Sequence, residues 1–242
     1  MLNVIAINSS KRKMNTYGLI SQVKEILKND NINVEIINLF DYDIKPCIGC
    51  EHCLIKGNCI LKDDVSNIME KIKLSDGIIL TSPVYMENIS GSLKTFLDRT
   101  CKWFHRPEIY GKPILVIATT KGSGLKFTLK YLERVGVQWG GFNAGKIGRD
   151  IRTIDNKIKI RECKRFINHM NMDKKDYSPS LTALIHFQVQ KVLAKKVGYL
   201  DSEYWIEKNW NSEVYYFKCK TNFFKGLTAK SFGNFLDIVV NK

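Results

Sequence analysis

The 242-residue sequence is short of several features that would assign a function at once. No run of about 18 apolar residues occurs, so we expect no membrane-spanning helix. Neither G-x-x-x-x-G-K-[ST] nor G-x-G-x-x-G is present, which argues against a P-loop and against a dinucleotide-binding first turn. Arginine is scarce, with 8 against 30 lysines, and because base readout relies on arginine we expect no nucleic-acid partner.

What is present suits an ordinary globular protein, with 44% hydrophobic and 26% charged residues. The apolar N-terminus has neither the charged start nor the cleavage site of a signal peptide, so we expect a first strand and a cytoplasmic protein. The net charge of +14 is uneven. Residues 1–90 carry 10 basic and 11 acidic side chains, and residues 91–242 carry the other 28 and 13. This later excess predicts either a solvated surface or attraction of anionic cofactors and partners.

Residues 1–170 alternate between apolar strand-like and helix-like segments, which predicts a parallel sheet covered by helices on both faces. We expect an α/β, flavodoxin-like, doubly wound five-stranded sheet of order 2-1-3-4-5. The expected strands are 2–7, 33–39, 78–81, 114–118 and 137–146, and the expected helices are 15–29, 63–73, 90–103, 125–135 and 154–170. Ser90 is a suitable N-cap.

Residues 171–242 depart from this alternation and predict a mainly helical, aromatic-rich extension packed on the core. Helices are expected at 181–196, 203–210 and 224–240, with a short strand at 215–217. The aromatic residues favour packing of the extension, with a lid or dimer contact as the alternative.

Three loops follow strands 1, 3 and 4 and should share the carboxyl edge of the sheet, where ligands of such folds bind. The first, residues 8–16, offers hydroxyls and helix amides for a phosphate, or is merely a polar loop capped by Asn15 or Thr16. The second, residues 82–88, is apolar and aromatic and suits a flat heterocycle. The third, residues 119–124, contains glycines that permit close backbone approach. Asp98 and Arg99 favour a structural ion pair or a cap.

Together the segments N-S-S-K-x-x-x-N-T, S-P-V-Y-x-x-N-x-x-G-x-L-K-x-F-x-D-R and T-T-x-G-S-G resemble the NAD(P)H-dependent FMN reductase family, most closely its iron-sulfur flavoprotein subgroup. The resemblance covers residues 1–170 and implies FMN as cofactor and a homodimer or homotetramer. It assigns the phosphate to Ser9, Lys11, Asn15 and Thr16. It assigns the flavin ring to Pro83, Val84, Tyr85, Met86, Asn88, Thr119, Thr120, Gly122 and Gly124. Lys11 stands where the family usually has arginine, which predicts weaker phosphate binding.

Four of the seven cysteines, Cys47, Cys50, Cys53 and Cys59, lie within 13 residues. Their spacing is more compact than that of structural zinc sites and is similar to ferredoxin-like [4Fe–4S] motifs. A cluster, free or redox-active thiols, and zinc therefore compete as interpretations. The remaining Cys101, Cys163 and Cys219 are expected to be buried.

These observations favour a flavin-dependent oxidoreductase that takes electrons from NAD(P)H or a ferredoxin-like donor and passes them on, through the cluster where one is present. An electron-transfer flavoprotein without hydride chemistry is the alternative. Trp103, His105 and Arg106 are candidates to reach the flavin edge or the nicotinamide phosphate, or else form a surface loop. No catalytic side chain is identified.

Overall fold

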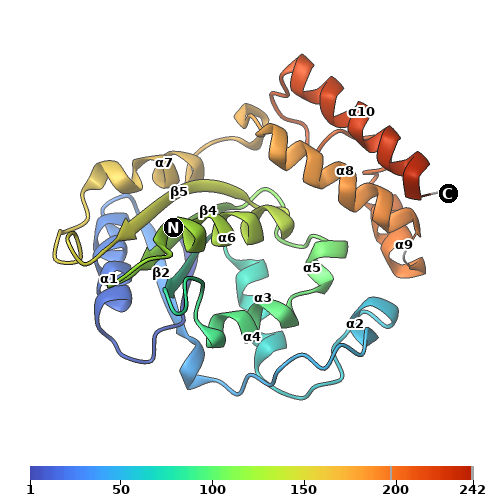
Figure 1. Cartoon of the computed structure of the whole chain (residues 1–242). Coiled ribbons are helices and arrows are strands. Elements are labelled where there is room, and N and C mark those ends of the chain that lie inside the picture. Colours follow the sequence, from blue (N-terminus) through green and yellow to red (C-terminus); the bar gives the residue numbers. More distant parts are fainter. Residues whose placement is uncertain (197, 241–242) are drawn as a thin grey trace.

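The computed structural model describes residues 1–196 and 198–240 and has one parallel sheet at its centre (Figure 1). The strands are β1 (Leu2–Asn8), β2 (Ile32–Asn38), β3 (Gly77–Pro83), β4 (Pro113–Thr119) and β5 (Phe142–Arg149). Their order is β2-β1-β3-β4-β5, and all four pairings are parallel. The predicted fold class is therefore confirmed. Every residue of β3 and β4 is buried, which explains why these strands are almost continuously apolar.

Helices cover both faces of this sheet. On one face lie α1 (Asn15–Lys28) and α7 (Ile160–Met170), and on the other lie α3 (Val65–Leu74), α4 (Gly91–Arg99) and α6 (Leu125–Gln138). Short helices α2 (His52–Ile55) and α5 (Lys102–His105) flank the second face. Ser90 caps α4 as expected, its hydroxyl accepting a hydrogen bond from the amide of Leu93 at 3.4 Å.

The fifth strand and the following helix begin later than predicted. Helix α6 continues to Gln138, and the chain then turns at Gly140, whose φ of +88° favours glycine. As a result β5 starts at Phe142, and residues 150–159 form a loop before α7 rather than its first turns. The structure thus leaves a long connection at the carboxyl end of β5.

The C-terminal extension contains α8 (Leu181–Lys196), α9 (Tyr199–Glu207) and α10 (Phe223–Val240). Its buried rings Trp205, Trp210, Tyr215 and Tyr216 join the core cluster on the α1 and α7 face of the sheet. The strand predicted at 215–217 is wrong, because these residues are bends and the carbonyl of Tyr216 accepts a hydrogen bond from Trp210 Nε1 at 2.9 Å instead. Among the described residues no helix is long and apolar enough to cross a membrane.

Candidate functional site

Helix α1 begins at the carboxyl end of β1 without a side-chain cap. Its N-cap residue is Met14, not Asn15 or Thr16 as predicted, and no carboxylate lies in its first turn. The amides of Asn15, Thr16 and Tyr17 donate no hydrogen bond to any described residue. Because such amides and the helix dipole attract anions, this helix end is suited to a phosphate group.

A cavity of about 280 Å³ lies in front of this helix end. Seven of the residues assigned from the sequence line it, namely Asn15, Thr16, Pro83, Val84, Tyr85, Thr119 and Thr120. Five further residues line it, Ser10, Arg12, Met14, Lys121 and Ile154. Arg12 belongs to the basic run Lys11–Lys13, which the sequence already marks as directed at a phosphate, although the resemblance assigns only Lys11 of this run to the site. Ile154 comes from the loop after β5 and carries no local signal.

The remaining assigned residues do not line the cavity. The Ser9 hydroxyl donates to the carbonyl of Thr81 at 2.9 Å and accepts from the Ser90 hydroxyl at 2.9 Å, so it joins two loops rather than facing a ligand. Lys11 is exposed beside the cavity. Buried hydroxyls of Thr16 and Thr119 lie 2.7 Å apart and join the first loop to the third.

Residues 85–88 form a tight turn beside the cavity. Tyr85 and Asn88 exchange two backbone hydrogen bonds, at 2.9 and 3.0 Å. Met86 and Glu87 between them have φ of 45° and 64°, a conformation that non-glycine residues adopt at a cost of order 1–3 kcal/mol and that often marks functional sites. Met86 is 97% exposed. The turn therefore presents backbone and side chain at the mouth of the cavity.

The third loop, residues 119–124, packs against this turn. Gly124 has φ of +83°, and a Cβ built there would lie 2.5 Å from Glu87 Cα. The Ser123 hydroxyl donates to the Glu87 carboxylate at 2.6 Å. Gly122 donates its amide to Thr120 Oγ1 at 3.0 Å. Gly124 thus does not line the cavity, but it allows the third loop to pack closely against the 85–88 turn beside it.

The cysteine-rich loop forms a second, separate site. Cys47, Cys50, Cys53 and Cys59 line one small cavity of about 30 Å³. Burial, followed by the neighbouring thiols of Cys101, Cys59 and Cys47, raises the pKa of Cys53. Within residues 1–196 and 198–240, however, no three Cys, His, Asp or Glu side chains converge closely enough to hold a metal ion.

Arg99 is the main anchor of this loop. Its guanidinium pairs with Asp63, with Nη2 to Oδ1 at 3.1 Å, donates to the carbonyl of Lys45 at 2.7 Å and reaches Cys59 Sγ at 3.2 Å. Asp63 and Arg99 side chains are fully buried, and although burial favours the neutral acid, the hydrogen bonds from Arg99 hold the pKa of Asp63 below its usual value. The expected partnership of Asp98 with Arg99 is wrong, since Asp98 pairs with Lys94.

Arg106 is the second anchor and connects the loop to the C-terminal extension. It donates to the carbonyls of Cys53 and Leu54 and, at 2.7 Å, to Asp201 of α9. Asp201 also accepts from His105 Nδ1 at 3.0 Å. This hydrogen bond, and after it one with Cys101, raises the pKa of His105 to about 9.

Two expectations for this region are wrong. Trp103, His105 and Arg106 neither form a surface loop nor line the cavity at α1, because Trp103 is fully buried and the other two bind Asp201. Of the three isolated cysteines only Cys163 is buried, while Cys101 is exposed beside the cysteine loop.

The sheet order and the cavity at its carboxyl edge define a flavodoxin-like α/β protein. A family model described as NADPH-dependent FMN reductase matches residues 2–148, and the chain belongs to that family, which supports a flavin-dependent oxidoreductase or electron-transfer protein.

A relative of similar length resembles the chain in sequence, and solved structures share its fold. An iron-sulfur flavoprotein of Archaeoglobus fulgidus is 29% identical over 222 residues, which span 86% of this chain and 99% of that protein. RosB, solved with bound 8-demethyl-8-formylriboflavin-5′-phosphate, superposes with a TM-score of 0.57 at 12% identity, covering 88% of each chain. A short-chain flavodoxin from a bacterial microcompartment superposes at 0.50 with 14% identity, covering 71% of this chain and 97% of its own.

Proposed function

We propose that the chain is an FMN-dependent oxidoreductase that binds the cofactor in the carboxyl-edge cavity. The observation that carries this proposal is the uncapped end of α1, which opens into that cavity together with Arg12. Amide donors and a guanidinium are the groups that proteins use to hold a terminal phosphate. FMN contains such a phosphate, and its isoalloxazine ring supplies both two-electron and one-electron chemistry.

The protein's own residues orient the cofactor. The amides of Asn15, Thr16 and Tyr17 would hold the phosphate, and the Thr16–Thr119 hydrogen bond keeps the two loops at a fixed separation. The amides of Met86 and Glu87 donate to no described residue, so the turn offers them to the polar edge of the ring. Tyr85, which is 56% exposed, would cover the ring on the solvent side.

We further propose that NAD(P)H or a ferredoxin-like carrier is the electron donor and that the protein works in the cytoplasm as a homodimer or homotetramer. The name of its family and the resemblance of its loops support this donor class. Seven free cysteines favour a reducing compartment. Anaerobic mixing with NADPH, NADH or reduced ferredoxin separates an enzyme from an electron carrier, because only the enzyme bleaches the flavin with a nicotinamide nucleotide.

We propose in addition that the four clustered cysteines hold a [4Fe–4S] cluster. Four thiols face one cavity, an arginine donates to one of them, and a full-length relative is named an iron-sulfur flavoprotein. In such a cluster each thiolate binds a different iron, so the four cysteines need to surround one space and need not converge on a single ion. Iron and sulfide analysis of anaerobically purified protein tests this, and zinc or no metal would overturn it.

FMN binding is tested by quenching of flavin fluorescence. Arg12→Gln should weaken FMN binding about tenfold, since a charge-assisted contact contributes about 1.5–3 kcal/mol. Lys13→Gln is the matched control, because this substitution removes the same charge from the same loop and Lys13 does not line the cavity. Failure of the wild-type protein to bind FMN would refute the proposal, and equal effects of the two variants would refute the phosphate assignment.

A further inference from the structure

A second cavity, of about 440 Å³, lies at the carboxyl end of β5. It is adjacent to the cavity at α1. Thr153 lines the second cavity while the next residue, Ile154, lines the first. Arg149 lines the second cavity and Thr120 lines the first. The amide of Thr120 donates a hydrogen bond of 2.9 Å to the carbonyl of Arg149. The two cavities therefore share a wall of consecutive and hydrogen-bonded residues.

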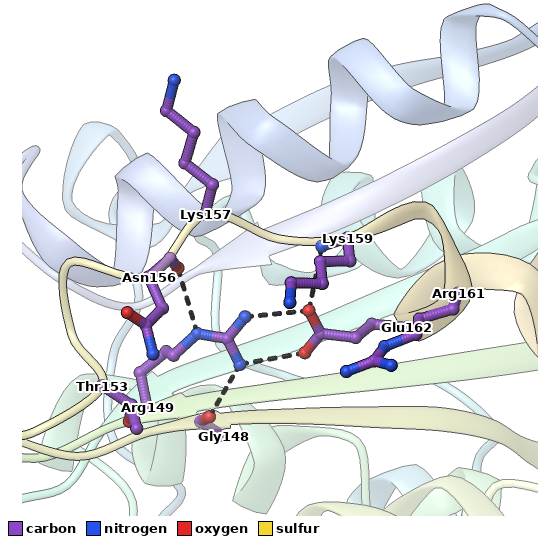
Figure 2. A pocket seen from close by; sticks show the side chains of 8 residues that line it. All are labelled: Gly148, Arg149, Thr153, Asn156, Lys157, Lys159, Arg161 and Glu162. Carbon is purple, nitrogen blue, oxygen red and sulfur yellow. Dashed lines mark hydrogen bonds and ion pairs between the residues drawn. The ribbon is translucent and has the colours of Figure 1, made fainter.

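Arg149 gives this wall its shape (Figure 2). It is only 8% exposed and forms a two-pronged pair with Glu162, at 2.9 and 3.0 Å. Its Nε donates to the carbonyl of Asn156 at 3.2 Å, and Glu162 accepts the amide of Lys159 at 2.9 Å. These bonds tie the 150–159 loop to the start of α7. The wall of the cavity is thus held in place by several hydrogen bonds and one ion pair.

The rest of the lining is strongly basic. Lys157, Lys159 and Arg161 are exposed and have no ion pair with any described residue. Since Glu162 neutralises Arg149, the lining carries three uncompensated positive charges. Figure 2 shows Lys159 and Arg161 on either side of the Glu162 carboxylate, while Lys157 extends away from them. An anionic ligand is the chemistry that this lining matches.

We propose that this cavity binds the phosphate-bearing end of a reduced nicotinamide nucleotide whose ring reaches the flavin in the adjacent cavity. The inference rests on the proposed FMN-dependent function and names where its donor is held. The volume lies in the range of small-molecule sites and exceeds the needs of one inorganic phosphate. Three exposed cations around one concave wall favour a small polyanion over the broad surface of an acidic carrier protein.

The test compares two double variants of one helix region. Lys159→Gln with Arg161→Gln removes two cations from the lining. Lys164→Gln with Arg165→Gln removes two exposed cations that do not line the cavity and is the matched control. Both proteins are first saturated with FMN, so that a nucleotide probe cannot occupy the flavin phosphate site. The probe is 2′,5′-ADP, measured by isothermal titration at low and high salt.

We expect 2′,5′-ADP to bind the wild-type and control proteins alike, less tightly as salt is raised. The cavity variant should bind it at least about tenfold more weakly, or about 1.4 kcal/mol. In turnover assays KM for the nicotinamide nucleotide should rise by a similar factor at unchanged kcat, and FMN affinity should not change. No binding of 2′,5′-ADP, equal weakening in both variants, or displacement by an acidic ferredoxin alone would overturn the site.

These outcomes remain separate from failure of the proposed function. Loss of that function would show as no FMN binding or no bleaching by a nicotinamide nucleotide in the wild-type protein. If the protein binds 2′,5′-ADP through these cations but is not reduced by NADPH or NADH, the nucleotide site is supported and the donor assignment is refuted. If either nucleotide reduces the protein and the cavity variant leaves KM unchanged, the function is supported and the nucleotide site is refuted.

Discussion

Arg106 Nη1 donates a hydrogen bond of 2.7 Å to Asp201 Oδ1, a residue 95 positions later in the chain. The same guanidinium holds the carbonyls of Cys53 and Leu54, so the C-terminal extension and the cysteine loop share one anchor. Asp201 is 1% exposed. The extension therefore supports the cysteine site as well as adding apolar core.

Replacing this carboxylate should be costly. Asp201→Asn leaves Arg106 and His105 without their negative partner, and breaking a buried pair typically costs about 3–5 kcal/mol. Urea denaturation should show this loss in the free energy of unfolding. The control is Asp98→Asn, whose ion pair with Lys94 is exposed and should contribute less than about 1 kcal/mol. Equal losses in both variants would contradict the anchor role.

The raised pKa of His105, about 9 against an ordinary value of 6.5, gives stability a definite pH dependence. The protonated form is favoured in the folded state, so its contribution is complete below about pH 6.5 and is lost as pH rises through 9. The full shift corresponds to at most about 3 kcal/mol. The free energy of unfolding should therefore fall between pH 7 and 9.5 in the wild type and fall less in His105→Gln. Parallel pH profiles would refute this assignment.

Gly124 should be required for the turn that borders the cavity at α1, the proposed FMN site. Gly124→Ala combines a left-handed backbone with a Cβ 2.5 Å from Glu87 Cα, so the turn must shift and FMN affinity should fall about tenfold, at a cost of order 1–3 kcal/mol. Gly122→Ala is the control, because a Cβ there meets nothing within 4 Å and no positive φ is required. Flavin fluorescence titration measures both, and similar affinities would be inconsistent with the role given to Gly124.

Alkylation of the metal-free protein should separate the cysteines by exposure. Cys47, Cys50 and Cys101 are exposed, whereas Cys163 is fully buried and burial raises its pKa to about 11. With iodoacetamide at pH 8, peptide mass spectrometry should find the three exposed thiols modified long before Cys163. Protection of Cys47 and Cys50, but not Cys101, after reconstitution with iron and sulfide would identify them as ligands. Early modification of Cys163 would contradict the packing described for α7.

The sheet could be predicted because its information is local. Apolar runs such as Ile78–Leu80 lie between polar turns, and their burial on both faces leaves little alternative to a parallel sheet. The cap at Ser90 and the helix 181–196 are likewise local patterns. The three loops at the carboxyl edge followed from the strand ends, whereas the individual residues assigned to the cofactor came from the resemblance to the FMN reductase family.

The anchors of the cysteine loop could not be predicted in this way. Arg99 and Asp63 are 36 positions apart, and the adjacent Asp98 offered a more obvious partner for Arg99. Arg106 and Asp201 belong to segments with no common periodicity. Ile154 lines the cavity at α1 from a loop, because α7 starts later than its sequence pattern indicates. Polar pairs between residues far apart in the sequence depend on the tertiary fold, and no sequence spacing or periodicity indicates them.

The position of Asp201 also sets an order of events during synthesis. The ribosome completes all five strands by Arg149, and domains fold from the N-terminal side as they emerge. The cavity at α1 can therefore form on the nascent chain before Arg106 has its carboxylate partner in α9. A chain terminated before α9 would keep the cavity at α1 and lose the carboxylate that braces the cysteine loop.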